Sequence, residues 1–358
     1  MLILPAKISF LEKLHMISVV LGSIGYFIYG LFAIRLQGGG RKGYTLSTAS
    51  SYYVRNLFAR SSLRKLQWFL PSTHQAYNQF ASLWRFKPVT HTFPDGSMGH
   101  WMGNKAAKQI IVYLHGGGYM VPATLAHMKW VYDAHRELTK AGTDTSAIIL
   151  SYQLTPHRQY PLQLQQAVNL VKHVIEVEGL TPSQIILAGD SAGGNLTLAV
   201  ISHLMHPHPD VPELKLAEPF RGILLISPWI AFDYVEPIAK EYRWDMLSAP
   251  GLRETSAAFI GPAPPDNYNE PVRAPPSWWE PLRQVTSSVY IYCGGSEMLR
   301  PSIEKIAQAM SDSVNLTINI VPGATHVSTI VDCIVPFNKG VDKESIAWLK
   351  AQGEKTEV

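Results

Sequence analysis

The most regular feature of the chain is an alternation, from residue 109 onward, between short apolar runs and segments with helical spacing of apolar residues. The apolar runs are rich in valine and isoleucine and lack the polar alternation of a half-exposed strand. Such strands, separated by helices, predict an α/β fold with a largely parallel sheet covered on both faces. A site is then expected at the carboxyl ends of the strands. The predicted strands are QIIVYL, AIILSYQ, QIILAGD, RGILLISPW, SSVYIYCG and NLTINIVPG.

An apolar stretch near the N-terminus, residues 16–34, contains nineteen residues without a charge and shows no polar face. About twenty apolar residues span a bilayer as a helix, whereas a buried core helix usually has a polar face. A cleaved signal peptide is the alternative, but its apolar region would be shorter and no small-x-small cleavage site follows. We expect residues 1–37 to be an uncleaved signal anchor with a transmembrane helix over about 16–34.

Residues 38–100 form a basic region between this anchor and the predicted sheet. GGGRKG at 38–43 predicts a flexible linker, and helical spacing over 49–86 predicts cap helices that cover the site expected at the strand ends. Residues 1–94 carry eleven Lys and Arg and one acid. Because these charges are interleaved with Trp, Phe and Leu, they favour a membrane surface over nucleic acid. Residues 101–352 are the expected catalytic domain.

The segment Gly189-Asp190-Ser191-Ala192-Gly193 contains the pattern G-x-S-x-G between a predicted strand and a predicted helix. This context is the one a nucleophile elbow requires. The serine of an elbow sits in a strained backbone conformation, so the residues two positions away must lack bulk. Ser191 is therefore the candidate nucleophile, and the helix that begins near Ala192 points its N-terminus at the site.

A second glycine loop, His115-Gly116-Gly117-Gly118, follows an earlier predicted strand. Glycine lets the backbone approach a substrate closely, and its N–H groups can hold a developing oxyanion. We expect these donors to come from Gly116, Gly117 and Ala192. His115 is expected to order the loop rather than to transfer protons.

A serine nucleophile needs a base, and the base needs an acid that orients it. Behind such an elbow the chain order is serine, acid, histidine. His326 follows the last predicted strand and is the candidate base. Glu297 follows the strand before it and is the candidate acid, with Asp312 as the alternative. Asp332 comes after the histidine and violates the order.

Metal and disulfide chemistry find little support in the sequence. Cys293 and Cys333 are the only two cysteines, which excludes a disulfide scaffold. We expect two buried free thiols, with one disulfide as the alternative in an oxidising compartment. His206 and His208 have no third ligand nearby, so a solvated loop is expected there. We expect no metal and no cofactor.

Several motifs lie in the predicted order: HGGGY at 115–119, GDSAGGN at 189–195, SPW at 227–229, then Glu297 and His326. Together they resemble the hormone-sensitive-lipase family of esterases over roughly residues 105–350. The resemblance implies an α/β-hydrolase fold. The usual acid in that family is Asp, whereas this chain has Glu297.

The resemblance also implies a cap and a location. The family builds its cap from N-terminal helices and an insertion after the sixth strand, which correspond here to residues 45–95 and about 232–285. Membrane-anchored members such as arylacetamide deacetylase and fungal steryl acetyl hydrolases place the site in the lumen of the endoplasmic reticulum. The sequon at Asn315 is compatible with a glycosylated lumenal domain. The alternative is a cytosolic domain, which the basic residues Arg35, Arg41, Lys42 and Arg55 behind the helix favour by the positive-inside rule.

These observations predict a carboxylic-ester hydrolase that acts on short acyl esters of apolar alcohols. The alternative is an acyltransferase or cyclising enzyme of natural-product synthesis that uses the same three residues. A non-catalytic binder, like the gibberellin receptors that lack the histidine, is disfavoured by His326. The expected partners are a small-molecule ester and a lipid bilayer, not nucleic acid, and the sequence does not predict the oligomeric state.

Overall fold

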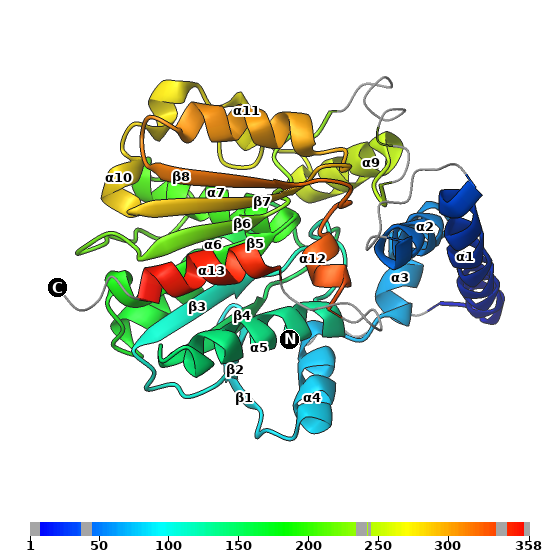
Figure 1. Ribbon diagram of the computed structural model, residues 1–358, viewed down its shortest axis with the longest axis horizontal. Coiled ribbons are helices and arrows are strands. Elements are labelled where there is room, and N and C mark those ends of the chain that lie inside the picture. The colour runs from blue at the N-terminus through cyan, green and yellow to red at the C-terminus, as the bar shows by residue number, and fades with distance from the viewer. Residues whose placement is uncertain (1–7, 37–44, 234–241, 243–244, 334–341, 354–358) are drawn as a thin grey trace.

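The computed structural model describes residues 8–36, 45–233, 242, 245–333 and 342–353. One eight-stranded sheet has the strand order β1-β2-β4-β3-β5-β6-β7-β8 (Figure 1). β2 runs antiparallel to both neighbours, and the other adjacent pairs are parallel, which confirms the predicted α/β sheet. The strands are β1 (Val89–Thr92), β2 (Met98–Met102), β3 (Gln109–Leu114), β4 (Thr145–Ser151), β5 (Ile185–Asp190), β6 (Gly222–Ile226), β7 (Ser288–Gly294) and β8 (Asn315–Val321).

Helices cover both faces of the sheet. In β3, Ile111 and Tyr113 pack among residues of α5 and α13, whereas Ile110 and Val112 pack among residues of α6 and α7. Every residue of β3 and β5 is buried, which explains their uninterrupted apolar sequences. The helices are α1 (Phe10–Leu36), α2 (Thr45–Arg60), α3 (Leu63–Phe69), α4 (Thr73–Trp84), α5 (Leu125–Lys140), α6 (Leu162–Glu176), α7 (Ala192–Met205), α9 (Ala249–Ile260), α10 (Leu282–Val285), α11 (Arg300–Met310), α12 (Ser328–Val331) and α13 (Lys343–Gly353).

The carboxyl ends of the parallel strands meet at one edge of the sheet, on the right in Figure 1. The loops that follow β3, β5, β6, β7 and β8 carry His115, Ser191, Ser227, Glu297 and His326 in turn. Because parallel strands share a direction, residues far apart in sequence come together at this edge.

α2, α3 and α9 lie beyond this edge and form the cap (Figure 1). α9 reaches the loop after β3 because the ring of Phe259 stacks on Tyr119, with ring centroids 3.8 Å apart. The expectation that all helices of residues 49–86 cover the site is wrong for α4. α4 packs against α5 on a face of the sheet, since its buried Phe80 contacts Tyr132 edge to face. Residues 234–241 and 243–244 of the predicted cap insertion lie outside the described part of the chain.

α1 begins at Phe10, six residues before the predicted apolar stretch, and is 27 residues long. Its segment Phe10–Phe32 is long and apolar enough to cross a membrane. Only 22% of the most apolar window is buried, because α1 contacts the cap helices α2 and α3 along one side alone.

Candidate active site

The turn between β5 and α7 holds Ser191 at φ 49° and ψ −117°. A positive φ is costly for a residue with a side chain and persists only where the surroundings impose it. The surroundings here require two glycines. A Cβ on Gly189 would lie 2.3 Å from the carbonyl oxygen of Gly193, and a Cβ on Gly193 would lie 1.9 Å from that of Leu114. The turn therefore has the conformation predicted for a nucleophile elbow.

The turn brings Ser191 against the loop that follows β8. His326 Nε2 lies 2.9 Å from Ser191 Oγ, within hydrogen-bond distance, although 135 residues separate them in sequence. His326 is buried, and Ser191 is only 9% exposed. A neutral imidazole in this position can accept the proton of the serine hydroxyl.

Glu297 lies on the other side of the imidazole and is fully buried. Its Oε2 is 3.7 Å from His326 Nδ1 and accepts a 2.6 Å hydrogen bond from the hydroxyl of Ser227. The same hydroxyl accepts a hydrogen bond from the N–H of Val327, at 3.2 Å. Ser227 thus joins the loop of the acid to the loop of the histidine.

Neither of the other two acids weighed in the sequence lies beside the histidine in this way. Asp312 is exposed and lies just before β8, at the opposite edge of the sheet. Asp332 follows the short helix α12, and its N–H donates to the carbonyl of Ser328. The structure therefore brings together Ser191, His326 and Glu297.

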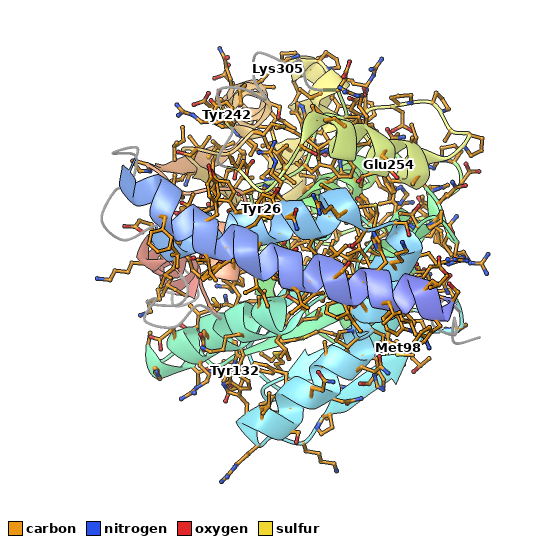
Figure 2. The ribbon with its side chains drawn as sticks, turned by 90° about the vertical axis from the view of Figure 1, so that its right-hand side faces the viewer. Tyr26, Met98, Tyr132, Tyr242, Glu254 and Lys305 are labelled. Atoms are coloured by element: carbon orange, nitrogen blue, oxygen red, sulfur yellow. The ribbon has the colours of Figure 1, made fainter. Side chains whose placement is uncertain are left out.

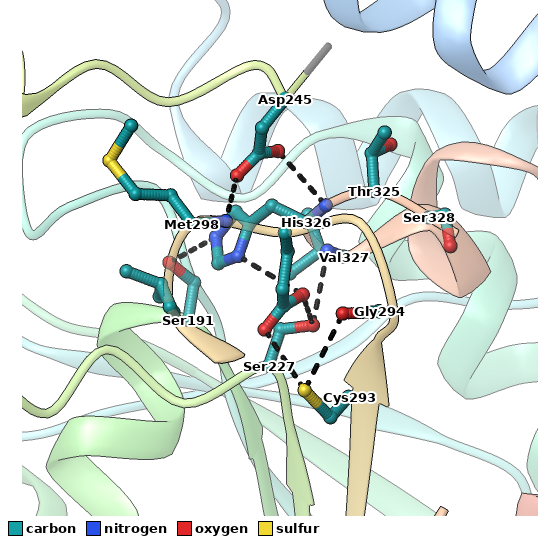
Figure 3. Close-up of polar contacts among 12 residues, drawn as sticks. Ser191, Ser227, Asp245, Cys293, Gly294, Met298, Thr325, His326, Val327 and Ser328 are labelled. Carbon is teal, nitrogen blue, oxygen red and sulfur yellow. Dashed lines mark hydrogen bonds and ion pairs between the residues drawn. The ribbon is translucent and has the colours of Figure 1, made fainter. Parts of the chain in front are cut away.

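Asp245 is a second buried carboxylate beside His326, and sequence reasoning missed it (Figure 3). Its oxygens accept hydrogen bonds from three backbone N–H groups: Met246 at 2.8 Å, Met298 at 2.7 Å and His326 at 3.1 Å. An aspartate inside the cap insertion belongs to no motif, so no sequence signal pointed to it. Its carboxylate links the cap insertion to the loops of Glu297 and His326.

The buried charges around the imidazole shift the pKa values of the site. Burial lowers the pKa of His326, but the nearby charges of Glu297, Asp245 and Asp190 raise it above its usual value. Burial and the charge of Glu297 raise the pKa of Asp245 to about 6, although His326 and two backbone N–H groups oppose the rise. His326 is therefore a stronger base than an isolated imidazole.

The glycine loop after β3 differs from the sequence prediction in one donor. The N–H of Gly116 donates a 2.8 Å hydrogen bond to Asp190 Oδ1, and the hydroxyl of Tyr113 donates to the same oxygen at 2.7 Å. Gly116 was expected to hold the oxyanion, but its N–H already has this buried partner. Gly117, with φ 105°, and Ala192, at the first position of α7, remain the candidate donors.

His115 makes buried contacts within this loop. Its Nδ1 lies 2.7 Å from the carbonyl oxygen of Gly116, and its ring stacks on Tyr152 with centroids 4.2 Å apart. The hydroxyl of Tyr152 donates to the His115 carbonyl at 2.7 Å. Burial lowers the pKa of His115 to about 3, so the ring is neutral at physiological pH. Gly118 is also at positive φ, and a Cβ on this residue would lie only 2.9 Å from Cγ2 of Thr255 in the cap.

The remaining residues considered in the sequence are the two cysteines and the pair His206 and His208. Cys293 and Cys333 are free thiols, the first buried and the second half-buried. His206 Nε2 lies 2.9 Å from the carbonyl of Trp278, and His208 Nδ1 accepts from the N–H of Asp210 at 3.1 Å. Among the described residues, no group of three or more His, Cys, Asp or Glu could hold a metal ion.

Comparison with known proteins supports the fold. The model of a family described by its alpha/beta hydrolase fold matches residues 111–330. Steryl acetyl hydrolase 1 of Saccharomyces cerevisiae is 24% identical over 215 residues, which cover 57% of this chain and 48% of that protein. The chain thus spans about half the length of this relative.

Two further similarities are to a shorter stretch of the chain and to most of its fold. Arylacetamide deacetylase of Oryctolagus cuniculus is 31% identical over 118 residues, or 32% of this chain and 28% of that protein. A crystal structure of an esterase from the bacterial hormone-sensitive lipase family superposes with a TM-score of 0.61 and 19% identity. That match covers 86% of this chain and 96% of the other.

Proposed function

This chain belongs to the α/β-hydrolase family matched over residues 111–330, and from that premise we propose that it is a carboxylic-ester hydrolase. Ser191 is the nucleophile, His326 the base and Glu297 the acid that orients it. The observation that carries the proposal is the 2.9 Å contact between Ser191 Oγ and His326 Nε2 at a strained turn.

The reaction proceeds by acyl transfer in two halves. Ser191 Oγ attacks the ester carbonyl while His326 takes its proton, and the N–H groups of Gly117 and Ala192 hold the oxyanion. His326 then gives the proton to the departing alcohol. Water, activated by the same imidazole, attacks the acyl-serine and releases the acid. Glu297 stabilises the imidazolium that forms in each half.

The proposed substrates are short acyl esters of apolar alcohols. Similarity to a steryl acetyl hydrolase and to a deacetylase supports the short acyl group. The apolar helix α1 and the buried aromatic rings of Tyr119, Trp229, Phe232 and Phe259 near the turn support an apolar alcohol.

The test is hydrolysis of p-nitrophenyl esters of increasing acyl length, with trapping of the acyl-enzyme. The wild-type protein is expected to cleave acetate and butyrate fastest and to carry the acyl group on Ser191 in peptide mass spectra. The Ser191→Ala protein is expected to lose both properties. Equal rates in the two proteins contradict the proposal.

A proposed location follows from α1 and from the family resemblance. α1 attaches the protein to the membrane of the endoplasmic reticulum, with the catalytic domain in the lumen. Asn315 is exposed at the start of β8, at the edge of the sheet opposite to the site. A loss of mass on endoglycosidase treatment, absent from the Asn315→Gln protein, is expected. Identical mobility of both proteins before treatment contradicts the lumenal location.

A further inference from the structure

α1 packs along the cap rather than projecting from it. α1 runs antiparallel to α2. Gly30 of α1 approaches Ala49 near the start of α2, and Ser23 accepts a buried 2.9 Å hydrogen bond from Asn56 Nδ2 further along α2. Figure 2 shows α1 lying across this face of the molecule in front of α2, and Figure 1 shows the same pair from the side. A Cβ on Gly30 would lie 3.1 Å from the Cα of Ala49, so the two helices are in close contact there.

The packing continues through polar contacts to the start of α1. Glu12 forms an ion pair with Arg64, and the ammonium group of Lys13 lies 5.6 Å from the ring centroid of Trp68 in α3. The contacts with α2 and α3 therefore extend from Glu12 to Gly30. Eighteen helical residues rise about 27 Å, close to the roughly 30 Å thickness of a hydrocarbon core.

The opposite side of α1 is a continuous apolar row open to solvent. Its residues recur every three or four positions, which places them on one face of the helix. Each has about half or more of its surface exposed, and such a row needs an apolar environment. The row consists of Leu14, Ile17, Leu21, Ile24, Ile28 and Phe32.

A membrane-spanning orientation conflicts with these contacts. If α1 crossed the bilayer and kept them, α2 and α3 would enter the hydrocarbon with Arg55, Arg60, Arg64 and Lys65. Charged side chains facing lipid there are strongly disfavoured. A helix lying in the plane of the membrane keeps every contact, buries the apolar row, and leaves Arg60, Arg64 and Lys65 outside the hydrocarbon, where anionic headgroups can attract them.

The cap helices under α1 contact the loops of the candidate site. Ser51 Oγ of α2 lies 2.9 Å from Thr325 Oγ1, next to His326. The Gln67 side chain of α3 donates 2.8 Å hydrogen bonds to the carbonyls of Met120 and Thr155, and Met120 follows the glycine loop. The edge of the sheet that carries the site therefore faces α1.

We propose that α1 lies in the plane of the membrane, with the apolar row among the acyl chains, and that the active site faces the bilayer. Ester substrates then reach Ser191 from the membrane rather than from water. This orientation differs from the spanning helix that the sequence predicts. The substrate route, unlike the orientation, rests on the proposed esterase function.

The orientation is tested by spin labels at Leu14→Cys, Leu21→Cys and Ile28→Cys in the full chain, in a Cys333→Ser background. The protein is bound to vesicles of phosphatidylcholine and phosphatidylserine, and label depth is measured from oxygen and nickel-chelate accessibility. Equal, shallow depths of about 5–10 Å are expected at all three positions. A label at residue 21 about 10 Å deeper than the other two would show a spanning helix and overturn the proposal.

Val177→Cys provides the matched control, because Val177 is an apolar residue 70% exposed at the end of α6. Its label is expected to remain in water. Labels of α1 that also remain in water would refute the membrane contact.

The substrate route is tested with Leu21→Ser and Ile28→Ser combined in one protein. Hydrolysis of an ester dissolved in the vesicles is expected to fall several-fold relative to wild type, with the rate on soluble p-nitrophenyl acetate unchanged. Unchanged rates on both substrates, or an equal fall in both, reject delivery from the membrane. If wild type cleaves neither ester while the labels lie shallow, the proposed function fails and the orientation stands.

Discussion

Asp245→Asn removes a negative charge that is buried between the loops of Met298 and His326. Burial and the charge of Glu297 raise the pKa of Asp245 from its usual 3.8 to about 6, despite the opposing charge of His326. At 1.36 kcal/mol per pKa unit, this difference corresponds to roughly 3 kcal/mol by which folding disfavours the ionised carboxylate. Asparagine has one acceptor oxygen, so at least one backbone N–H loses its partner, at about 1–3 kcal/mol at any pH.

The two effects have different pH dependences. Well below pH 3.8, Asp245 is protonated in both the folded and the unfolded chain, so its raised pKa costs the folded state no stability there. As the pH rises from about 3.8 to about 6, the unfolded chain has lost the proton while the folded chain still holds it, and wild type loses roughly 3 kcal/mol of stability from this group. The Asp245→Asn protein lacks this loss. The variant is therefore less stable than wild type at pH 4, and the difference shrinks or reverses by pH 8.

Urea unfolding, followed by tryptophan fluorescence from pH 4 to pH 8, measures this difference. Asp312→Asn is the control, because Asp312 is exposed, and its unfolding free energy should follow wild type at every pH. Parallel curves for wild type and Asp245→Asn would refute the reasoning, since they require an aspartate with an ordinary pKa. Because the charge of Asp245 also raises the pKa of His326, the acidic limb of kcat/KM should move to lower pH in the variant.

Three substitutions test the rest of the site. Gly193→Ala places a Cβ 1.9 Å from the Leu114 carbonyl and should cost about 3 kcal/mol or more, seen as a lower Tm; an unchanged Tm contradicts the described turn. Glu297→Gln removes the charge beside the imidazole and should lower kcat by about 10³–10⁴-fold with the fold intact by circular dichroism; wild-type kcat would reject Glu297 as the acid. Ser227→Ala removes the 2.6 Å donor to Glu297 and should lower kcat about tenfold with little change in KM, whereas a change confined to KM would place Ser227 in substrate binding.

The sheet and the turn at Ser191 were predictable because local constraints determine them. Strands buried on both faces have uninterrupted apolar sequences, and a serine at φ 49° needs glycines on both sides. The order of the strands then limited the base to His326 and favoured Glu297 as the acid. Each of these predictions depends on backbone geometry that a short sequence pattern can specify.

Other features depend on partners far apart in sequence, and no pattern specified them. Gly116 lies in the expected loop, but only Asp190, 74 residues later, determines that its N–H points away from the site. Asp245 contacts His326 across 81 residues, from an insertion with no recognisable motif. The apolar sequence of α1 predicted a membrane helix. A hydropathy pattern does not reveal the hydrogen bond between Ser23 and Asn56 that holds α1 against α2.

These long-range contacts make the cap part of the candidate active site rather than a separate cover. Asp245 belongs to the cap insertion, and its carboxylate holds the backbone of both Met298 and His326. Ser51 of α2 contacts Thr325, the residue before the histidine. A displacement of the cap that breaks these hydrogen bonds must release the loop on which His326 Nε2 is held 2.9 Å from Ser191. If His326 is the base that we propose, conditions that detach the cap should reduce turnover before they unfold the sheet.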